Sequence, residues 1–370
     1  MRVGLISYHS EPNYGTMLQA YALAKALGLL GVECEYLRYY NIPKPSILYT
    51  CVRSIVRFFI PAKKGTFDFF DSEAFKDTKD AFDKFHDTYI PCSKAKYYSD
   101  TVKDSNSIYD LFVVGSDQTW SEYMNRFATS ANFLEFVLDS NKKASYAPSI
   151  GSLTISDSFK HRLILVLSSF RHLSCREEPN ARMLSKELGK DVKYVIDPTL
   201  LLSPDQWNEL AVAPELPRKK YVLAYILGEK QCISDYAEKL GDSCGLPVYY
   251  VLTRPMYLEK NNCLTGVGPS EFIGLIRDAA YVVTDSFHGT AFCLNYGTQV
   301  YSFTKRPSLS GEKSLDNDRI RLLLEEFNLS NRMKDDSDSS LEKDYDPNDY
   351  LKKLESFRES SADYLRTIVK

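Results

Sequence analysis

The sequence predicts an α/β protein with two Rossmann-like, doubly wound parallel-sheet domains that face each other across a cleft. Apolar runs of strand length alternate with helix-length amphipathic segments from the first residue onward, which is typical of parallel sheets with crossover helices. The chain has 370 residues, of which 44% are hydrophobic and 26% charged, so it is long enough for two domains of ordinary size.

The first half of the chain alternates in this way. Its expected strands are residues 3–7, 32–39, 109–115, 143–148, 172–175 and 192–196. Its expected helices are residues 16–30, which Gly31 ends, 156–170 and 178–188. Apolar runs of four to eight residues between turn residues are read as buried strands.

A second alternation begins at residue 221. It predicts strands at residues 221–227, 248–252, 281–284 and 299–303, and helices at 233–240, 269–279, 291–296, 320–327 and 350–369. Residues 203–220 hold three prolines and little strand signal, so the hinge is expected there. We therefore expect an N-terminal domain over residues 1–205, a C-terminal domain over 206–345 and a final helix within 346–370.

The composition argues against several classes of protein. The net charge of −3 argues against a nucleic-acid binder with a strongly basic face. The eight cysteines form no C-x-x-C pair and no Cys/His spacing typical of zinc sites, so we expect buried, reduced thiols and no metal site. No signal peptide and no apolar run of membrane-spanning length are evident, which favours a cytoplasmic protein.

Residues 46–64 form a basic, apolar insertion in the N-terminal domain. Two arginines and two lysines interrupt or follow its aliphatic and aromatic residues. The segment is either a helix packed on its own domain with the arginines exposed or a peripheral contact with the inner face of a membrane.

The predicted strand at residues 281–284 ends in a polar cluster that contains His288. Ligands of doubly wound sheets bind beyond the carboxyl ends of strands. Free N–H groups at the start of the following helix favour a phosphate or carboxylate beside His288. His288 is therefore either a catalytic residue or a hydrogen-bonded residue that caps the turn.

Polar residues also follow two strands of the N-terminal half. After the first strand come His9, Asn13, Tyr14 and Gly15, and after the strand at 109–115 come Ser116, Asp117, Gln118 and Trp120. Hydrogen-bonding side chains beside an aromatic ring suit a sugar. Alternatively, Trp120 packs in a domain interface and Asp117 caps a helix. There is no G-x-G-x-x-G and no P-loop motif, so neither a dinucleotide nor a P-loop ATP site is expected.

Two arginines are candidates for anion binding. Arg176 follows the predicted strand at 172–175, where its planar fork of donors could hold a carboxylate or phosphate. Arg319 precedes the helix at 320–327. Alternatively, Arg176 forms a surface pair with Glu177, and the residues before Arg319 only cap the helix.

Together these motifs resemble those of the polysaccharide pyruvyl transferase family, whose members are similar in fold to the two-domain GT-B glycosyltransferases. The resemblance covers most of residues 1–330. It rests on five segments in this order: Asn13-Tyr14-Gly15 with Leu18-Gln19-Ala20, Val113 to Gln118 with Trp120, Ser174 with Arg176-Glu177, Asp197 to Leu201, and Thr284 to Thr290.

The resemblance implies an enzyme that moves a pyruvate ketal from phosphoenolpyruvate onto a sugar of a capsule, exopolysaccharide or cell-wall polymer, or onto its lipid-linked precursor. It implies that His288 is the general acid and that Arg176 binds the donor. The other implied donor-binding residues are Ser286, Gly289, Thr290, Arg319 and Lys305, and the implied acceptor-binding residues are His9, Asn13, Tyr14, Gly15, Ser116, Asp117, Gln118 and Trp120. No cofactor is expected beyond phosphoenolpyruvate as substrate.

One departure from the family pattern leaves other functions open. Characterised members often have an arginine two residues before the histidine, whereas this chain has Ser286. Either Arg319 replaces that cation or the donor differs. The alternatives are a GT-B-like glycosyltransferase that uses a nucleotide sugar and a non-catalytic carbohydrate-binding or assembly protein.

Overall fold

The computed structural model describes residues 1–45, 72–125, 130–213, 215–304 and 316–370. The basic segment 46–64 and Lys305 lie outside the described residues. Within these ranges, no helix combines the length and the apolar character that a membrane crossing requires.

The N-terminal domain is built on a parallel sheet of order β3-β2-β1-β4-β5. Its strands are β1 (Arg2–Ile6), β2 (Glu33–Tyr40), β3 (Cys92–Tyr98), β4 (Leu111–Val114) and β5 (Lys143–Ser145). The pair β6 (Leu173–Cys175) and β7 (Val192–Tyr194) extends it through a bridge between Ala144 and His172. The helices of this domain are α1 (Tyr14–Leu29), α3 (Glu73–Tyr89), α4 (Asp157–Leu167) and α5 (Glu178–Leu188).

The C-terminal domain has a parallel sheet of order β10-β9-β8-β11-β12-β13, the doubly wound arrangement. Its strands are β8 (Val222–Tyr225), β9 (Val248–Val251), β10 (Cys263–Leu264), β11 (Tyr281–Thr284), β12 (Gln299–Phe303) and β13 (Met333–Lys334). Its helices are α8 (Gln231–Cys244), α9 (Pro269–Asp278), α10 (Phe287–Tyr296) and α11 (Asp316–Glu326). The predicted fold of two Rossmann-like domains is confirmed.

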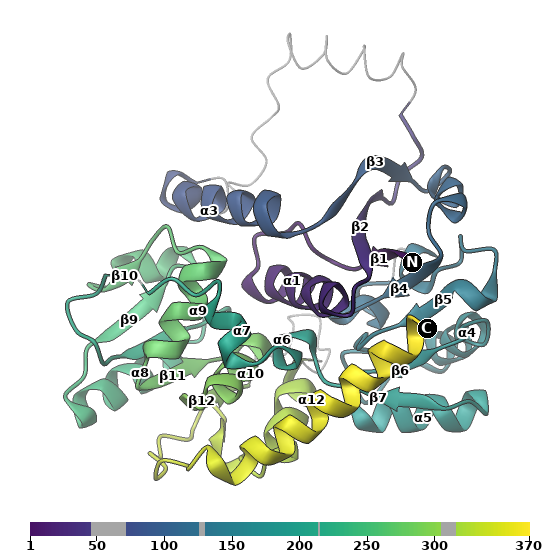
Figure 1. Ribbon diagram of the computed structural model, residues 1–370. Coiled ribbons are helices and arrows are strands. Elements are labelled where there is room, and N and C mark those ends of the chain that lie inside the picture. The colour runs from purple at the N-terminus through teal and green to yellow at the C-terminus, as the bar shows by residue number, and fades with distance from the viewer. Residues whose placement is uncertain (46–71, 126–129, 214, 305–315) are drawn as a thin grey trace.

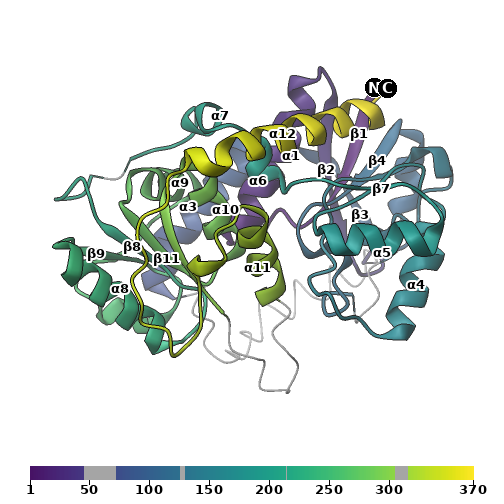
Figure 2. The ribbon, with the colours of Figure 1, turned by 90° about the horizontal axis from the view of Figure 1, so that it is seen from below.

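In the described part of the chain, α6 (Pro198–Leu201), α7 (Pro204–Asn208) and α12 (Asn348–Ile368) run between the domains. The short helices α6 and α7 lead from one sheet to the other. The last helix, α12, starts at the C-terminal domain and crosses to the N-terminal domain (Figure 1). There the hydroxyl of Tyr364 donates to the carbonyl of Ser145 at 2.9 Å. Viewed from below, α12 runs over α6, and both termini lie at the same end of the molecule (Figure 2).

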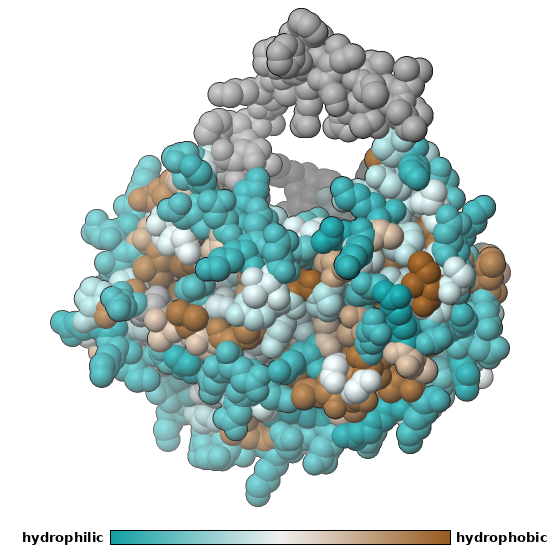
Figure 3. Space-filling view, turned by 45° about the horizontal axis from the view of Figure 1, so that its top comes forward, coloured by the Kyte–Doolittle hydropathy of each residue, from teal (hydrophilic) through white to brown (hydrophobic). Residues whose placement is uncertain are grey.

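The central strands consist of consecutive buried residues because helices cover both faces of each sheet. Every residue of β4 and of β8 is buried, as expected for parallel strands that are covered by helices on both faces. On the face shown in Figure 3, hydrophobic residues lie among hydrophilic ones.

The structure differs from the sequence-based expectations at several elements, and α6, β10 and β13 are among those that were not expected. Helix α3 and strand β3 were not predicted, and the expected hinge contains α7, which Ser203 and Gln206 begin with a capping box. Helix α10 begins four residues earlier than expected, at Phe287. The described cysteines are free thiols, as expected, but only Cys175 and Cys293 are buried.

Candidate active site

His288 lies in the first turn of α10, directly after β11. The hydroxyl of Ser286 accepts a hydrogen bond from the Gly289 N–H at 3.3 Å, so Ser286 is the N-cap that starts the helix early. The His288 side chain is 9% exposed, and its imidazole faces the N-terminal domain. The sequence placed this histidine correctly at the end of a strand, and the cap fixes its direction.

His288 contacts Asp197, a residue of the N-terminal domain. The distance from His288 Nε2 to Asp197 Oδ2 is 3.7 Å, an ionic contact longer than a hydrogen bond. Among the described residues, Nε2 has no hydrogen-bond partner. Burial alone would raise the pKa of the Asp197 carboxyl, but His288, Arg176 and the Thr199 N–H together hold it well below its usual range. Asp197 is therefore an anion that can stabilise a protonated His288.

Arg176 contacts the same carboxylate oxygen of Asp197 as His288 does. Its Nη1 donates to Asp197 Oδ2 at 2.7 Å and its Nε donates to Glu177 Oε1 at 3.3 Å, and its side chain is 3% exposed. Its Nη2 is buried and has no partner among the described residues. The surface pair that we considered for Arg176 and Glu177 is thus a buried pair.

A second arginine comes from the C-terminal domain. Arg319 in α11 lies 3.7 Å from a carboxylate oxygen of Asp117 and is 6% exposed. Its guanidinium carbon lies 5.5 Å from the centre of the Phe287 ring, and that of Arg176 lies 4.2 Å from the same centre. One arginine from each domain therefore flanks the residue that precedes His288.

A cavity of about 300 Å³ opens beside this cluster. Arg176, Asp197, Phe287 and Arg319 are among its lining residues. The volume is at the lower end of the range of small-molecule sites. Its charged lining residues also include four glutamates and a lysine: Glu177, Glu178, Glu325, Glu326 and Lys353.

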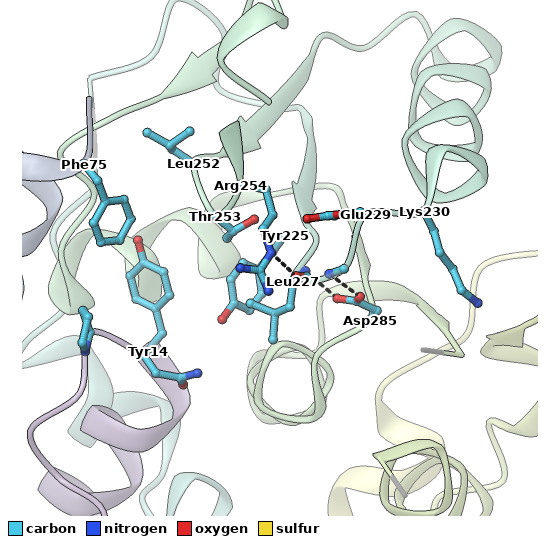
Figure 4. A pocket seen from close by; sticks show the side chains of 13 residues that line it. Tyr14, Phe75, Tyr225, Leu227, Glu229, Lys230, Leu252, Thr253, Arg254 and Asp285 are labelled. Atoms are coloured by element: carbon cyan, nitrogen blue, oxygen red, sulfur yellow. Dashed lines mark hydrogen bonds between the residues drawn. The ribbon is translucent and has the colours of Figure 1, made fainter. Parts of the chain in front are cut away.

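A second cavity of about 400 Å³ lies between the domains at the carboxyl ends of β8, β9 and β11 (Figure 4). Tyr14 and Phe75 of the N-terminal domain stand on one side of it, opposite Thr253 and Arg254. Arg254 donates its Nε to the carbonyl of Leu227 at 2.8 Å, which holds its guanidinium in the cavity.

Sequence reasoning missed the residues of the C-terminal domain that line this second cavity. They are Tyr225, Leu227, Gly228, Glu229, Lys230, Leu252, Thr253, Arg254 and Asp285. Most of them could have been found from their place in the sequence, because they lie at the carboxyl ends of expected strands, where ligands of such sheets bind. Asp285 is fixed by N–H donors of Leu227 at 2.7 Å and Gly228 at 2.8 Å, and Lys230 points away (Figure 4).

The acceptor residues expected after β1 lie in three different places. Asn13 caps α1 and lines the second cavity with Tyr14, whose ring stacks on Phe272 at 4.2 Å. Gly15 packs directly against His288. His9 is turned toward α3 and β3, where burial and the neighbouring His86 lower its pKa to about 4.

The residues after β4 join the histidine cluster. Ser116 donates to the carbonyl of Ala147 at 3.0 Å and to Asp197 at 3.2 Å, and Asp117 contacts Arg319. Gln118 is half-buried in the short turn that follows. One expectation is corrected: Trp120 is fully buried and donates its indole N–H to the carbonyl of Asn132, so its ring has no free face for a sugar.

A second correction concerns the residues around His288. Thr290 is fully buried, and its hydroxyl is bonded to the carbonyl of Ser286 at 2.9 Å and the hydroxyl of Ser302 at 2.8 Å. Gly289 uses its N–H in the cap. These residues therefore shape the start of α10, and the buried Thr290 hydroxyl is engaged within the C-terminal domain instead of facing a donor.

The contact between Gly15 and His288 gives a sharp test. A Cβ atom on Gly15 would lie 2.0 Å from His288 Nδ1, whereas a Cβ on Gly28 of the same helix has no atom within 4 Å. We expect Gly15→Ala to displace the imidazole and to lower turnover about 100-fold, since misplacement by about 1 Å can cost that much. Gly28→Ala is the matched control and should keep wild-type turnover; equal turnover in both variants would contradict the contact.

The fold and the site define a two-domain α/β protein whose charged cluster and larger cavity lie where the domains meet. Residues 13–304 match the family model described as polysaccharide pyruvyl transferase. The chain belongs to this family and is a transferase. Comparison with curated proteins found no match.

Solved structures give only distant similarities. UDP-GlcNAc 2-epimerase from Methanocaldococcus jannaschii is 11% identical, with a TM-score of 0.49 over 96% of this chain and 92% of the epimerase chain. The wall teichoic acid polymerase TagF is 10% identical, with a TM-score of 0.48 over 100% and 88% of the two chains. The E. coli ADP-heptose lipopolysaccharide heptosyltransferase II is 10% identical, with a TM-score of 0.39 over 97% and 99%. These values are too low to carry an activity over to this chain.

Proposed function

We propose that this protein transfers a pyruvate ketal from phosphoenolpyruvate to a sugar of a bacterial-type surface polysaccharide or of its lipid-linked precursor. The observation that carries the proposal is the cluster at the domain junction, in which His288 contacts Asp197 while Arg176 and Arg319 flank Phe287. Family membership supports a pyruvyl transfer. The donor and the acceptor class are our inference.

The proposed reaction begins with protonation. His288, whose Nε2 lies 3.7 Å from the Asp197 carboxylate, gives a proton to the methylene carbon of phosphoenolpyruvate, and the neighbouring carbon becomes oxocarbenium-like. One sugar hydroxyl attacks that carbon, phosphate leaves with its bridging oxygen, and a second hydroxyl closes the ketal. Of the two hydroxyl protons, one ends in the new methyl group through His288 and the other on phosphate.

Two cations are available for the carboxylate and phosphate of the donor. The Nη2 of Arg176 has no hydrogen-bond partner among the described residues. The guanidinium groups of Arg176 and Arg319 approach the Phe287 ring from different domains. A guanidinium binds carboxylate or phosphate with two parallel hydrogen bonds. We propose that Arg319 supplies the charge that relatives obtain from an arginine at the position of Ser286.

A base is needed for the attacking hydroxyl. The cluster contains three carboxylates, and Asp117 has the most exposed side chain at 15%, compared with 5% for Glu177 and none for Asp197. Asp117 also lies 3.4 Å from the hydroxyl of Thr16. We assign the proton-accepting role to Asp117 and place the sugar at the domain junction, between Asp117 and the cavity of about 400 Å³ that Tyr14 lines.

The direct test is phosphate release from phosphoenolpyruvate by the wild-type protein. The acceptor panel should contain galactose, mannose and glucose units, both free and lipid-linked, and the product should be identified by mass as a sugar with one added ketal. We expect release that depends on an acceptor. Binding of phosphoenolpyruvate without product on any acceptor would contradict the assigned acceptor class, and a lack of binding would contradict the donor.

A nucleotide-sugar glycosyltransferase is the second candidate. The observation that favours it is the cavity beyond β8, β9 and β11 with Arg254 inside, since nucleotides bind at such strand ends. Thermal stabilisation by a nucleotide sugar and not by phosphoenolpyruvate would support this candidate. A non-catalytic carbohydrate-binding or assembly role would instead predict stabilisation by neither compound.

We also propose a cytoplasmic location with peripheral membrane contact through residues 46–64. The support is compositional, because this segment combines basic and apolar residues. Co-sedimentation with liposomes that contain anionic lipid is the corresponding measurement.

A further inference from the structure

Three potential metal ligands meet at a place that no sequence motif marks. His9 comes from the loop after β1, His86 from the last turn of α3, and Cys92 is the first residue of β3. One ligand atom from each lies within 4.8 Å of the others. The nearest two of these residues in sequence are six apart, and His9 is 77 residues from His86, so spacing alone could not reveal the group.

The distances within this group fit a tetrahedral zinc ion. Zinc bonds of about 2.0–2.1 Å to nitrogen and 2.3 Å to sulfur, at tetrahedral angles, separate two nitrogens by about 3.3–3.4 Å and a nitrogen from a sulfur by about 3.5–3.6 Å. In the structure, His9 Nδ1 and His86 Nε2 are 3.3 Å apart, and Cys92 Sγ lies 3.8 Å from the first and 3.6 Å from the second. All three edges therefore match one face of the tetrahedron within about 0.3 Å.

The surroundings contain a carboxylate that favours a bound cation and the guanidinium of Arg38 beside Cys92, whose charge opposes one. The second ring nitrogen of His86, Nδ1, lies 3.3 Å from a carboxylate oxygen of Asp87, an arrangement that orients metal-bound histidines. His86 and Cys92 line one surface hollow and His9 lines another, so an ion can reach the group from solvent. Three protein ligands leave the fourth position for water.

We propose that His9, His86 and Cys92 bind a zinc ion. The ion would join the loop after β1 to α3 and β3. Helix α3 also contacts the C-terminal domain, where its Thr78 hydroxyl accepts a hydrogen bond from the Gly266 N–H at 3.0 Å. Zinc at this place would fix both the loop that leads to Gly15 and the helix that reaches across to the other domain.

The first experiment is metal analysis of the purified protein after incubation with zinc and desalting. We expect about one zinc per chain for the wild type and a large loss of zinc in Cys92→Ser. The matched control is Cys263→Ser, another half-buried free thiol, which should keep the wild-type content. Equal zinc in the two variants, or no zinc in the wild type, would overturn the proposal and leave a hydrogen-bonded group.

Cobalt provides a second readout that does not depend on how well a variant folds. Cobalt bound to the wild type should show a thiolate-to-metal charge-transfer band in the near ultraviolet, because Cys92 is a ligand.

Asp87→Asn should weaken zinc binding about 10- to 100-fold, the effect of losing a carboxylate that orients a histidine. Asp83→Asn, an exposed position of the same helix with the same charge change, should leave affinity unchanged. Cobalt binding without the thiolate band would contradict the assigned ligands.

Discussion

Replacement of His288 by alanine should lower phosphate release from phosphoenolpyruvate about 100- to 10,000-fold, the contribution of a general acid. The physical reason is that the imidazole beside Asp197 is the proposed proton source, with its Nε2 unpaired among the described residues. The rate of release should be measured at saturating phosphoenolpyruvate and acceptor, so that the chemical step is compared. Affinity for phosphoenolpyruvate should change much less, because the arginines remain.

The control for this variant is His161→Ala. His161 is an exposed residue of α4 that does not belong to the cluster around Asp197, and its loss should leave the rate unchanged. If His288→Ala releases phosphate as fast as the wild type, His288 is a cap of the turn and the general-acid assignment is wrong. If it loses donor binding instead of rate, His288 binds the phosphate.

Replacement of Arg176 by methionine should lower the free energy of unfolding by about 3–5 kcal/mol. Loss of one partner of a buried ion pair leaves the other charge uncompensated, and here Asp197 and Glu177 both lose their contact with the guanidinium. Burial alone would lower the pKa of Arg176, but the two carboxylates raise it. Urea unfolding followed by tryptophan fluorescence can measure this, because Trp120 and Trp207 are both buried.

Arg182→Met is the matched control for stability. Arg182 lies in α5, pairs with Glu178 four residues away and has a side chain that is 78% exposed. An exposed helix pair of this kind contributes at most about 0.5 kcal/mol. Equal stability of the Arg176 and Arg182 variants would mean that the charges around Asp197 are not balanced by Arg176.

The pH dependence of the Arg176 variant has a defined sign. The pKa of Asp197 in the folded protein lies below its unfolded value of about 3.9. Its ionised form therefore stabilises the fold above the unfolded pKa, and this contribution is lost as the pH falls. The difference in the free energy of unfolding between the wild type and Arg176→Met should therefore shrink as the pH falls from neutral to below the unfolded pKa of about 3.9.

The sequence predicted the elements whose residues carry a strong local signal. The strands at 281–284 and 299–303 and the helix at 178–188 match the structure at both ends. Helix α3 was missed although Phe75, Thr78, Phe82 and Phe85 lie on one buried stripe, because the rest of that segment is polar. Strand β3 was missed because it contains two lysines and a serine and no valine, isoleucine or leucine.

The candidate site was predicted in its parts but not in its assembly. Sequence alone determined the two-domain alternation, the position of His288 at a strand end and the presence of Arg176 and Arg319 near other element ends, since these depend on residues close together in the chain. Only the tertiary structure decided that Asp197 pairs with His288, that Trp120 is buried, and that His9 meets His86 and Cys92. The physical reason is that burial and through-space contacts depend on how the two sheets and α3 pack together, which local patterns do not encode.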